Sequence, residues 1–355
     1  MPAVASSLDL LAGTAAYAAA LAQVRAAPRR WLVTGGAGFI GSHLVEALLE
    51  LGQAVTVLDD LSTGHAANLD AVRELVGASA AARLRFERAD LRDAAAVAAA
   101  SEGVAVILHH AAMVSVPASI DDPIAAHHVN VTGFLHVLEA ARAVGARVVY
   151  AASSASYGDD PADVKVEDRL GRPLSMYAAS KTADEVYAAA YGQAYGLRSV
   201  GLRYFNVFGP RQDPRGAYAA VIPAWIEALA HGRPCVVHGD GLTTRDFCHV
   251  ANVVGANLLA ATTAAPDALG GVFNVGTGAR TTLLELYDAI VAALRAARPA
   301  RADLADLRPT FGPFRPGDVR HSCADVGRAR ARLGFEPAVG LREGVAHTLP
   351  SFLPD

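Results

Sequence analysis

The sequence has few cysteines, no run of basic residues and no long uninterrupted apolar segment. The spacing of Cys235, Cys248 and Cys323 fits neither a zinc site nor a disulfide framework, so we expect a reducing, cytoplasmic compartment. Lys+Arg 31 against Asp+Glu 35 give a formal net charge of −4, which argues against a nucleic-acid partner. Because Gly and charged residues interrupt the apolar stretches, we expect no membrane span. A small molecule is the expected partner.

What the 355 residues do contain is a regular alternation of short apolar runs and helical stretches. Continuous apolar strands separated by helices predict a parallel sheet covered on both faces, which is a doubly wound (Rossmann-type) α/β fold. The expected strands are Trp31–Thr34, Ala54–Leu58, Leu84–Glu87, Val104–Leu108, Arg147–Tyr150 and Arg198–Leu202. The expected helices include Ser42–Leu51, Pro123–Val144 and Tyr177–Tyr195.

The chain divides into three expected parts. Residues 1–28 are an Ala-rich N-terminal helical extension, with a helix from about Ser7 to Arg25, and they lack the basic start of a signal peptide. Residues 29–205 contain the alternating strands and helices. Residues 206–355, which Pro and Gly punctuate, are expected to form a smaller, mainly substrate-binding part, from which about 245–276 returns to the first domain.

A glycine loop follows the first expected strand and opens a helix. It satisfies Gly-x-Gly-x-x-Gly at Gly36, Gly38 and Gly41, and it also includes Gly35. Glycines here allow a tight turn and the close approach of a pyrophosphate, to which the helix N-terminus adds partial positive charge. Asp59 ends the second strand, where a carboxylate binds the adenosine ribose and favours NAD over NADP. The loop therefore predicts that the first domain binds NAD.

Plainer interpretations of these residues stay open. The loop fits an ordinary Gly-rich turn, with Asp59 and Asp60 as helix caps. Asp90, after the third strand, fits an adenine contact and a helix N-cap equally well. His109 and His110 follow the fourth strand at the carboxyl edge of the sheet, where ligands bind. They form no convincing metal constellation, so we expect a packing role for them and no metal.

Tyr177 and Lys181 lie four residues apart on an expected helix, so they share one face. A lysine ammonium beside a phenol favours the phenolate, which makes the tyrosine a usable base. Ser153 and Ser154 follow the fifth strand at the carboxyl edge, where a hydroxyl can bind a substrate alcohol. Taken singly, these residues fit a buried aromatic, a solvated lysine and turn serines. Together with a nicotinamide, they fit the removal of a hydride and a proton from an alcohol.

This set of residues resembles the extended short-chain dehydrogenase/reductase family, and within it the UDP-N-acetylglucosamine/UDP-N-acetylgalactosamine 4-epimerase subgroup. The resemblance extends from about Trp31 to Pro350. Beside the glycine loop, the matching stretches are Thr63-Gly-His65, Tyr150-Ala-Ala-Ser-Ser154, Leu202-Arg-Tyr-Phe-Asn-Val-Phe-Gly209, Arg211-Gln-Asp213, Gly216-Ala-Tyr-Ala-Ala-Val-Ile-Pro223, Arg245-Asp-Phe247 and Arg315-Pro-Gly-Asp-Val-Arg-His-Ser322. The later stretches are specific, because ordinary short-chain dehydrogenases lack them.

The resemblance implies a 4-epimerase with tightly bound NAD that interconverts UDP-GlcNAc and UDP-GalNAc, with UDP-Glc and UDP-Gal as further substrates to consider. It implies Tyr177 as the base, Lys181 as its lysine and Ser153, aided by Ser154, as the catalytic hydroxyl. The implied cofactor residues are Gly35, Gly36, Gly38, Phe39, Ile40, Gly41, Asp59, Asp60, Asp90, Leu91, Ala111, Tyr177, Lys181 and Tyr204. The implied substrate residues are Ser115, Ser153, Asn206, Gln212, Ala220, Val221, Arg245, Arg315, Asp318 and Ser322.

Two positions bear on the sugar. Ser322 stands where epimerases restricted to glucose and galactose have a tyrosine, and the small serine leaves space for a 2-acetamido group. Ala155 departs from the third serine of closer relatives, which changes the pocket around the sugar. The resemblance also implies a homodimer built on four helices, using Pro123–Val144 and Tyr177–Tyr195, although their apolar positions fit core packing equally well.

Three alternatives stay open. The first is a nucleotide-sugar dehydratase or decarboxylase on the same scaffold, but dehydratases have Thr-Asp-Glu where this chain has Ser153-Ser154-Ala155. The second is a 4-epimerase of UDP-(N-acetyl)hexuronic acids, which a basic residue near C6 would favour. The third is an NAD-binding protein without catalysis, against which the intact Ser/Tyr/Lys set argues.

Overall fold

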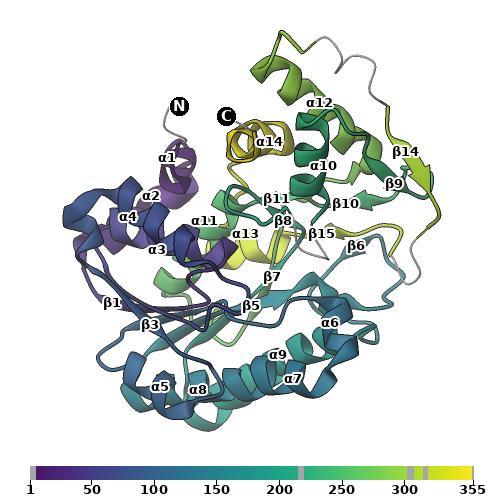
Figure 1. Cartoon of the computed structure of the whole chain (residues 1–355). Helices are drawn as coiled ribbons and strands as arrows, with labels where there is room; N and C mark the ends of the chain where they lie inside the picture. Colours follow the sequence, from purple (N-terminus) through teal and green to yellow (C-terminus); the bar gives the residue numbers. More distant parts are fainter. Residues whose placement is uncertain (1–4, 215–219, 302–307, 315–318, 354–355) are drawn as a thin grey trace.

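The computed structural model describes residues 5–214, 220–301, 308–314 and 319–353, and a seven-stranded parallel sheet forms its centre (Figure 1). The strand order is β12-β7-β5-β4-β1-β2-β3, so the order reverses between β1 and β4. This confirms the predicted doubly wound α/β fold, in which ligands bind at that reversal. The strands are β1 (Arg30–Thr34), β2 (Ala54–Asp59), β3 (Leu84–Arg88), β4 (Val106–His109), β5 (Arg147–Ser153), β7 (Ser199–Tyr204) and β12 (Val272–Val275).

Helices cover both faces of the sheet (Figure 1). The helices on one face are α3 (Phe39–Glu50), α4 (Ala66–Ala81) and α11 (Val250–Thr262). The helices on the other face are α5 (Ala94–Ala100), α8 (Gly133–Val144) and α9 (Met176–Tyr195). Each helical layer packs on one face of the sheet and forms an apolar core with it. The strands are therefore covered on both faces, which agrees with their continuous apolar sequences.

Helix α8 illustrates how the sequence produces this layer. Phe134, Val137, Leu138 and Ala141 recur at helical spacing, and all four are buried against the sheet. Full burial of each large apolar side chain contributes roughly 1.5–3 kcal/mol. The helix ends at Gly145, whose φ of 70° lies in the left-handed region that glycine adopts without strain.

Two predicted helices are interrupted. The helix expected over Pro123–Val144 consists of α7 (Pro123–His127), a π-helical turn η1 (His128–Thr132) and α8. Single π turns inside helices are common at functional sites. The helix expected from Ser7 to Arg25 is two helices, α1 (Ser7–Ala12) and α2 (Ala15–Ala26), which separate at Gly13.

The N-terminal helices belong to the core of the molecule. Leu8, Leu11 and Tyr17 are buried against α3 and α11. Gly255 on α11 makes room for them, because a Cβ there would lie 2.6 Å from the Tyr17 ring. The Tyr17 hydroxyl donates a hydrogen bond to the backbone oxygen of Glu336. The extension therefore ties the sheet domain to the C-terminal part of the chain.

The later part of the chain forms a third apolar core around α10 (Val221–Ala230), α12 (Leu283–Ala297) and α14 (Leu341–Thr348), which lie together beside the sheet domain (Figure 1). The remaining described helices are α6 (Val116–Asp121), η2 (Ser154–Tyr157), α13 (Gly327–Leu333) and η4 (Leu349–Phe352). The remaining strands are β6 (Val164–Lys165), β8 (Val207–Phe208), β9 (Val236–His238), β10 (Thr244–Arg245), β11 (Cys248–His249), β13 (Thr281–Thr282), β14 (Thr310–Gly312) and β15 (Cys323–Ala324). Two elements from this later part of the sequence belong to the central sheet layer: α11 packs on the sheet, and β12 is its edge strand next to β7.

Candidate active site

The turn between β1 and α3 is packed so tightly that it requires glycine. Gly35 has a φ of 69°, and a Cβ there would lie 2.6 Å from the backbone nitrogen of Ala111. A Cβ on Gly41 would lie 2.1 Å from the oxygen of Gly35. Gly38 is the N-cap of α3, and no side chain caps it. The amide groups at the start of α3 are therefore open to an anion.

The carboxylate at the end of β2 is buried and bound by backbone amides. The nitrogen of Ala37 donates to Asp59 Oδ2 at 3.0 Å, and that of Leu61 donates to Oδ1 at 2.9 Å. Burial raises the pKa of Asp59, and these hydrogen bonds oppose that effect. Neither Asp59 nor the exposed Asp60 caps a helix, because the N-cap of α4 is His65. The helix-cap alternative for these two residues is therefore wrong.

Asp90 follows β3 and forms an ion pair with Arg92, whose Nε lies 3.0 Å from Asp90 Oδ1. Hydrogen bonding to Arg92 lowers the pKa of Asp90. The N-cap of α5 is Asp93, which accepts hydrogen bonds from the first amides of that helix. Asp90 is thus not a helix cap, and together with Arg92 it lines a cavity.

A cavity of about 730 Å³ opens at the carboxyl edge of the sheet, where the strand order reverses. The predicted site residues that line it are Gly35, Gly38, Phe39, Ile40, Gly41, Asp59, Asp60, Asp90, Leu91, Ala111, Ser115, Ser153, Tyr177, Lys181, Tyr204 and Gln212. The predicted site residues that do not line it are Gly36, Ser154, Asn206, Ala220, Val221, Arg245 and Ser322. Arg315 and Asp318 lie outside the described residues.

Helix α9 carries Tyr177 and Lys181 into this cavity. The hydroxyl of Ser175 caps the helix, which therefore begins directly before Tyr177. The backbone nitrogen of Tyr177 donates to Ser119 Oγ at 3.0 Å, so α6 holds the first turn of α9. Lys181 Nζ donates to Asp184 Oδ2 at 3.1 Å, and the lysine side chain is only 2% exposed. Both predicted catalytic side chains are thus placed by a rigid helix.

Asn130 is a supporting residue that the sequence analysis missed. Its Nδ2 donates to Ser180 Oγ at 2.9 Å, and its Oδ1 accepts from the nitrogen of Met113 at 2.7 Å. The hydroxyl of Ser180 in turn donates to the backbone oxygen of Tyr177. Asn130 therefore ties the loop after β4 to the turn of α9 that carries Tyr177. It lies in the π-helical turn, which apolar periodicity does not predict.

The two candidate serines differ in position. Ser153 ends β5, lines the cavity, and accepts a hydrogen bond at Oγ from the nitrogen of Ala155 at 3.1 Å. Ser154 begins the short helix η2 and lies off the cavity wall. Of the two hydroxyls, the structure brings that of Ser153 into the cavity with Tyr177 and Lys181.

The two histidines after β4 also differ. His109 packs as predicted, with its ring 5.0 Å from that of Phe134. His110 lines the cavity, and its Nε2 lies 2.8 Å from the hydroxyl of Tyr204, which also accepts from Asn257 Nδ2 at 2.8 Å. Burial lowers the pKa of His110 to about 3, so its ring is neutral. His110 therefore packs on the Tyr204 ring, as expected, and it also orients the Tyr204 hydroxyl.

Three of the predicted substrate residues meet around one short segment. Asn206 Nδ2 donates to the oxygen of Asp246 at 3.1 Å. Arg245 Nη1 donates to the oxygen of Thr244 at 2.9 Å, and the nitrogen of Ser322 donates to that oxygen at 3.3 Å. Asn206 and Ser322 are far apart in sequence, yet both bind the segment 244–246, which itself contains Arg245.

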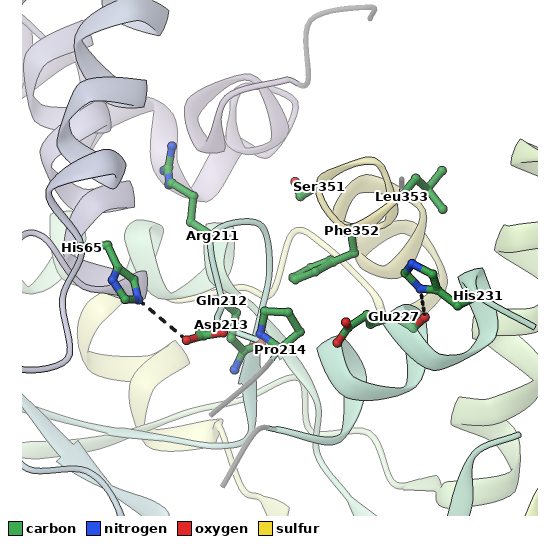
Figure 2. A pocket seen from close by; sticks show the side chains of 10 residues that line it. All are labelled: His65, Arg211, Gln212, Asp213, Pro214, Glu227, His231, Ser351, Phe352 and Leu353. Atoms are coloured by element: carbon green, nitrogen blue, oxygen red, sulfur yellow. Dashed lines mark hydrogen bonds and ion pairs between the residues drawn. The ribbon is translucent and has the colours of Figure 1, made fainter. Parts of the chain in front are cut away.

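A second cavity, of about 480 Å³, adjoins the first, because Gln212 lines both (Figure 2). Figure 2 shows His65 and Asp213 turned toward each other, with His65 Nε2 3.7 Å from Asp213 Oδ2. Gln212 Oε1 is buried and has no hydrogen-bond partner among the described residues. The predicted serine, tyrosine and lysine do not line this second cavity, so it is not the candidate catalytic site.

The described residues contain no group of three or more His, Cys, Asp or Glu side chains arranged to hold a metal ion. In the same residues, no helix has both the length and the apolar character needed to cross a bilayer. The three cysteines are buried and unpaired.

The site can be compared with known proteins. A sequence model of the NAD-dependent epimerase/dehydratase family matches residues 31–276. The UDP-glucose 4-epimerase of Mycolicibacterium smegmatis is 43% identical over 326 residues, which cover 91% of this chain and 98% of that protein. The structure of a UDP-N-acetylglucosamine 4-epimerase from Methanobrevibacter ruminantium, in complex with UDP-N-acetylmuramic acid, is 34% identical with a TM-score of 0.83, covering 92% of this chain and 98% of that chain. The Thermus thermophilus UDP-glucose 4-epimerase complex with NAD is 39% identical with a TM-score of 0.77, covering 91% and 98%.

Proposed function

The chain belongs to the NAD-dependent epimerase/dehydratase family, and we propose that it is a UDP-sugar 4-epimerase that interconverts UDP-GlcNAc and UDP-GalNAc through a 4-keto intermediate. The observation that carries this proposal is that one cavity contains the glycine turn, the buried Asp59 carboxylate, Ser153, Tyr177 and Lys181. Each of these groups has a separate role in the reaction proposed below.

The residues of the cavity fit NAD. The start of α3 has no side-chain cap, so its backbone amides can bind a pyrophosphate. Gly35 and Gly41 carry no side chain, so the pyrophosphate can approach the backbone of the turn closely. The carboxylate of Asp59 can accept hydrogen bonds from ribose hydroxyls and repels a 2′-phosphate. When bound, NAD supplies a two-electron acceptor and donor for the sugar carbon.

Protein side chains transfer the proton of the C4 hydroxyl and orient the sugar. Tyr177, as the phenolate, takes the proton of the C4 hydroxyl and returns it after the sugar has turned. Lys181 stabilises that phenolate by its positive charge. Ser153 orients the hydroxyl. Because the hydride taken from C4 would return to the opposite face of the same carbon, the reaction would invert C4 with no net redox change.

The UDP group is proposed to anchor the substrate while the keto sugar turns. We assign this binding to Asn206 and Arg245, which lie together because Asn206 binds the backbone of Asp246. Gln212 is a further proposed substrate contact and offers a buried unpartnered oxygen at the cavity. Further proposed contacts are Ser115, Ala220, Val221, Arg315 and Asp318, of which the last two lie outside the described residues.

The acetamido sugars are preferred as substrates because of Ser322. The resemblance supports this preference, because a small serine there, in place of a tyrosine, would leave space for a 2-acetamido group, and a UDP-N-acetylglucosamine 4-epimerase is among the similar structures. UDP-Glc and UDP-Gal are the second candidate pair, because two relatives with 43% and 39% identity are UDP-glucose 4-epimerases. We do not favour uronic acids: the described cationic side chains that line the cavity, Arg92 and Lys181, are both ion-paired.

The proposal is tested by incubating the purified protein separately with UDP-GlcNAc, UDP-Glc and UDP-glucuronic acid and resolving the products by NMR. We expect C4 inversion of UDP-GlcNAc with the highest kcat/KM and conservation of mass, which a dehydratase or decarboxylase would not give. Turnover of UDP-glucuronic acid alone, or no turnover of any of the three, would contradict the proposal.

We also propose a homodimer through α7, α8 and α9. These helices expose large apolar side chains, with Ile124 66% and Val186 63% exposed, and Tyr187 beside Val186 is 40% exposed. Such side chains are unusual on a monomer surface when they gather on packed helices. Light scattering of the wild type and of Val186→Asp tests the assignment: a dimer that becomes a monomer supports it, and a monomeric wild type contradicts it.

A further inference from the structure

The proposed catalytic lysine has a buried partner one turn further along α9. Lys181 Nζ donates to Asp184 Oδ2 at 3.1 Å, and the side chains are 2% and 0% exposed. Lys181 lines the cavity, whereas Asp184 does not. Asp184 therefore lies behind the lysine and has no access to a ligand. Its second oxygen, Oδ1, has no hydrogen-bond partner among the described residues.

Tyr177, Lys181 and Asp184 form one row along the helix. Their spacing of four and then three residues places all of them on the same face of α9. A phenol, an ammonium and a carboxylate thus follow one another from the cavity toward the interior. A base that is supported by a second group, which is itself held by a third, is a recurring arrangement in catalytic sites.

Other charged or titratable groups face this row from neighbouring elements. On α9, Glu185 is paired with Arg203 of β7, with Arg203 Nε 2.8 Å from Glu185 Oε1. Tyr150 of β5 is fully buried, and burial, followed by Glu185 and Asp184, raises its pKa. His109 and His110 from the end of β4 are neutral, because burial lowers the pKa of each ring. Among these groups, Asp184 is the carboxylate that compensates the charge of Lys181.

Burial raises the pKa of Asp184 to about 6, while the charge of Lys181 and its hydrogen bond oppose this effect. The carboxyl group is therefore mainly ionised at neutral and alkaline pH. A buried ammonium without a counterion tends to lose its proton. Bound NAD would add the positive charge of its nicotinamide to this cavity, and repulsion between like charges would increase that tendency.

We propose that Asp184 is a positioning residue of the reaction, whose carboxylate holds the Lys181 ammonium in place and keeps it charged while oxidised NAD occupies the cavity. This inference rests on the proposed 4-epimerase function. The carboxylate exchanges no proton with the substrate. It acts through Lys181, whose retained charge stabilises the Tyr177 phenolate and so allows the base to work near neutral pH.

The test compares the wild-type holoenzyme with Asp184→Asn, which removes the charge and preserves the shape. kcat and KM for UDP-GlcNAc are measured from about pH 6 to about pH 10. We expect the acid limb of the kcat profile to move to higher pH by about one unit or more, with KM little changed. Activity near neutral pH should fall by about tenfold and recover in alkaline buffer.

Glu185→Gln is the matched control. It makes the same chemical change at the next residue of α9, which is also buried but is paired with Arg203. It should lower the melting temperature and leave the acid limb where it is in the wild type. A merely structural role of Asp184 would give this same result for Asp184→Asn.

Asp184→Glu keeps the charge and provides a second variant if Asp184→Asn does not fold. Its acid limb should remain at the wild-type pH even if kcat falls, because the counterion is present. A displaced limb in Asp184→Glu, or an unmoved limb in Asp184→Asn, would overturn the role of Asp184. If the wild type itself does not turn over UDP-sugars, the proposed function fails instead, so the two failures are distinguishable.

Discussion

Helix ends at the amino edge of the central sheet differ from the start of α3 at its carboxyl edge. At the amino edge, arginines donate hydrogen bonds to carbonyl groups at the ends of helices. Arg147 Nη1, at the start of β5, donates to the oxygens of Ala261 and Thr263 at 2.8 Å each, beside the end of α11. Arg198, directly before β7, donates to the oxygen of Gly145 at the end of α8.

Arg83, directly before β3, repeats this pattern by donating to the oxygen of Leu49 in the last turn of α3 at 2.9 Å. At the opposite end of α3, no side chain caps Gly38, and the first amides face the cavity. A helix carries partial positive charge at its start and partial negative charge at its end. The protein therefore satisfies the negative ends itself and leaves a positive end for the anionic ligand.

We infer that contacts important for stability lie mainly at the amino edge of the sheet and that contacts important for function lie at its carboxyl edge. Changes at the carboxyl edge should affect NAD binding or turnover, beside any effect on stability, whereas changes at the amino edge should affect folding alone. This separation is typical of doubly wound sheets, whose ligands bind outside the carboxyl ends of the strands.

The largest expected effect comes from Tyr177→Phe at the carboxyl edge. Loss of the base should lower kcat by about 10²–10⁴-fold, while bound NAD and the melting temperature stay unchanged. Tyr187→Phe, on an exposed face of the same helix, is the matched control and should keep full activity. A Tyr177→Phe enzyme with near-normal kcat would refute the assignment of the base.

Two glycines with nearly equal positive φ, one at each edge of the sheet, allow the edges to be compared. Gly35 and Gly145 have φ of 69° and 70°, so alanine at either should cost about 1–2 kcal/mol for the left-handed conformation. A Cβ at Gly145 meets no atom within 4 Å, whereas one at Gly35 meets the backbone of Ala111. We therefore expect Gly35→Ala to lose its copurified NAD and Gly145→Ala to retain it. NAD content is measured after denaturation of each variant. Equal NAD content in the two variants would contradict the functional difference between the two edges.

The two edges also differ in how the stability of the protein depends on pH. Arginines do not titrate, but burial lowers the pKa of His110, at the carboxyl edge, and of His249, the N-cap of α11, each to about 3. The unfolded chain binds these protons near pH 6.5, so stability is complete above that value and declines as the pH falls toward about 3. The slope should reach about 1.4 kcal/mol per pH unit for each histidine.

Urea denaturation between about pH 8 and about pH 4 measures this decline. His249→Asn should flatten it, since asparagine can replace the N-cap but does not titrate. A variant whose pH dependence matches that of the wild type would show that other groups cause the acid loss.

The smallest expected effect is at the amino edge. Arg147→Met removes the hydrogen bonds to the end of α11 and should lower the free energy of unfolding by about 2 kcal/mol. kcat and NAD content should not change. Arg142→Met, which affects an exposed pair with Glu139, serves as the control and should have a smaller effect. A change in kcat on replacing Arg147 would mean that the two edges are not independent.

Much of the carboxyl edge could be predicted because its signals are local in sequence. The glycine turn, Asp59 at a strand end, and Tyr177 four residues before Lys181 are each readable within a few residues. The sequence does not show which of Ser153 and Ser154 enters the cavity, because that depends on where β5 ends and η2 begins. Pattern alone does not resolve a boundary of one residue.

The remaining features depend on contacts between distant segments. Asn130 supports α9 only because a π-helical turn directs it inward, and nothing in apolar periodicity predicts that turn. Asp184 resembles any polar helix residue until the packing of α9 buries it. Arg147 became a helix cap only when α11, more than a hundred residues later in sequence, packed beside β5.

The central claim is that hydride leaves C4 of the sugar, stays on the enzyme and returns to the same carbon. The most direct test uses UDP-GlcNAc carrying deuterium at C4, with the purified holoenzyme and unlabelled NADH added to the solution. The account predicts UDP-GalNAc that retains the deuterium at C4, with none in the solvent or in the added coenzyme. Loss of the label to either pool, or inversion of C4 by a protein that contains no NAD, would contradict it.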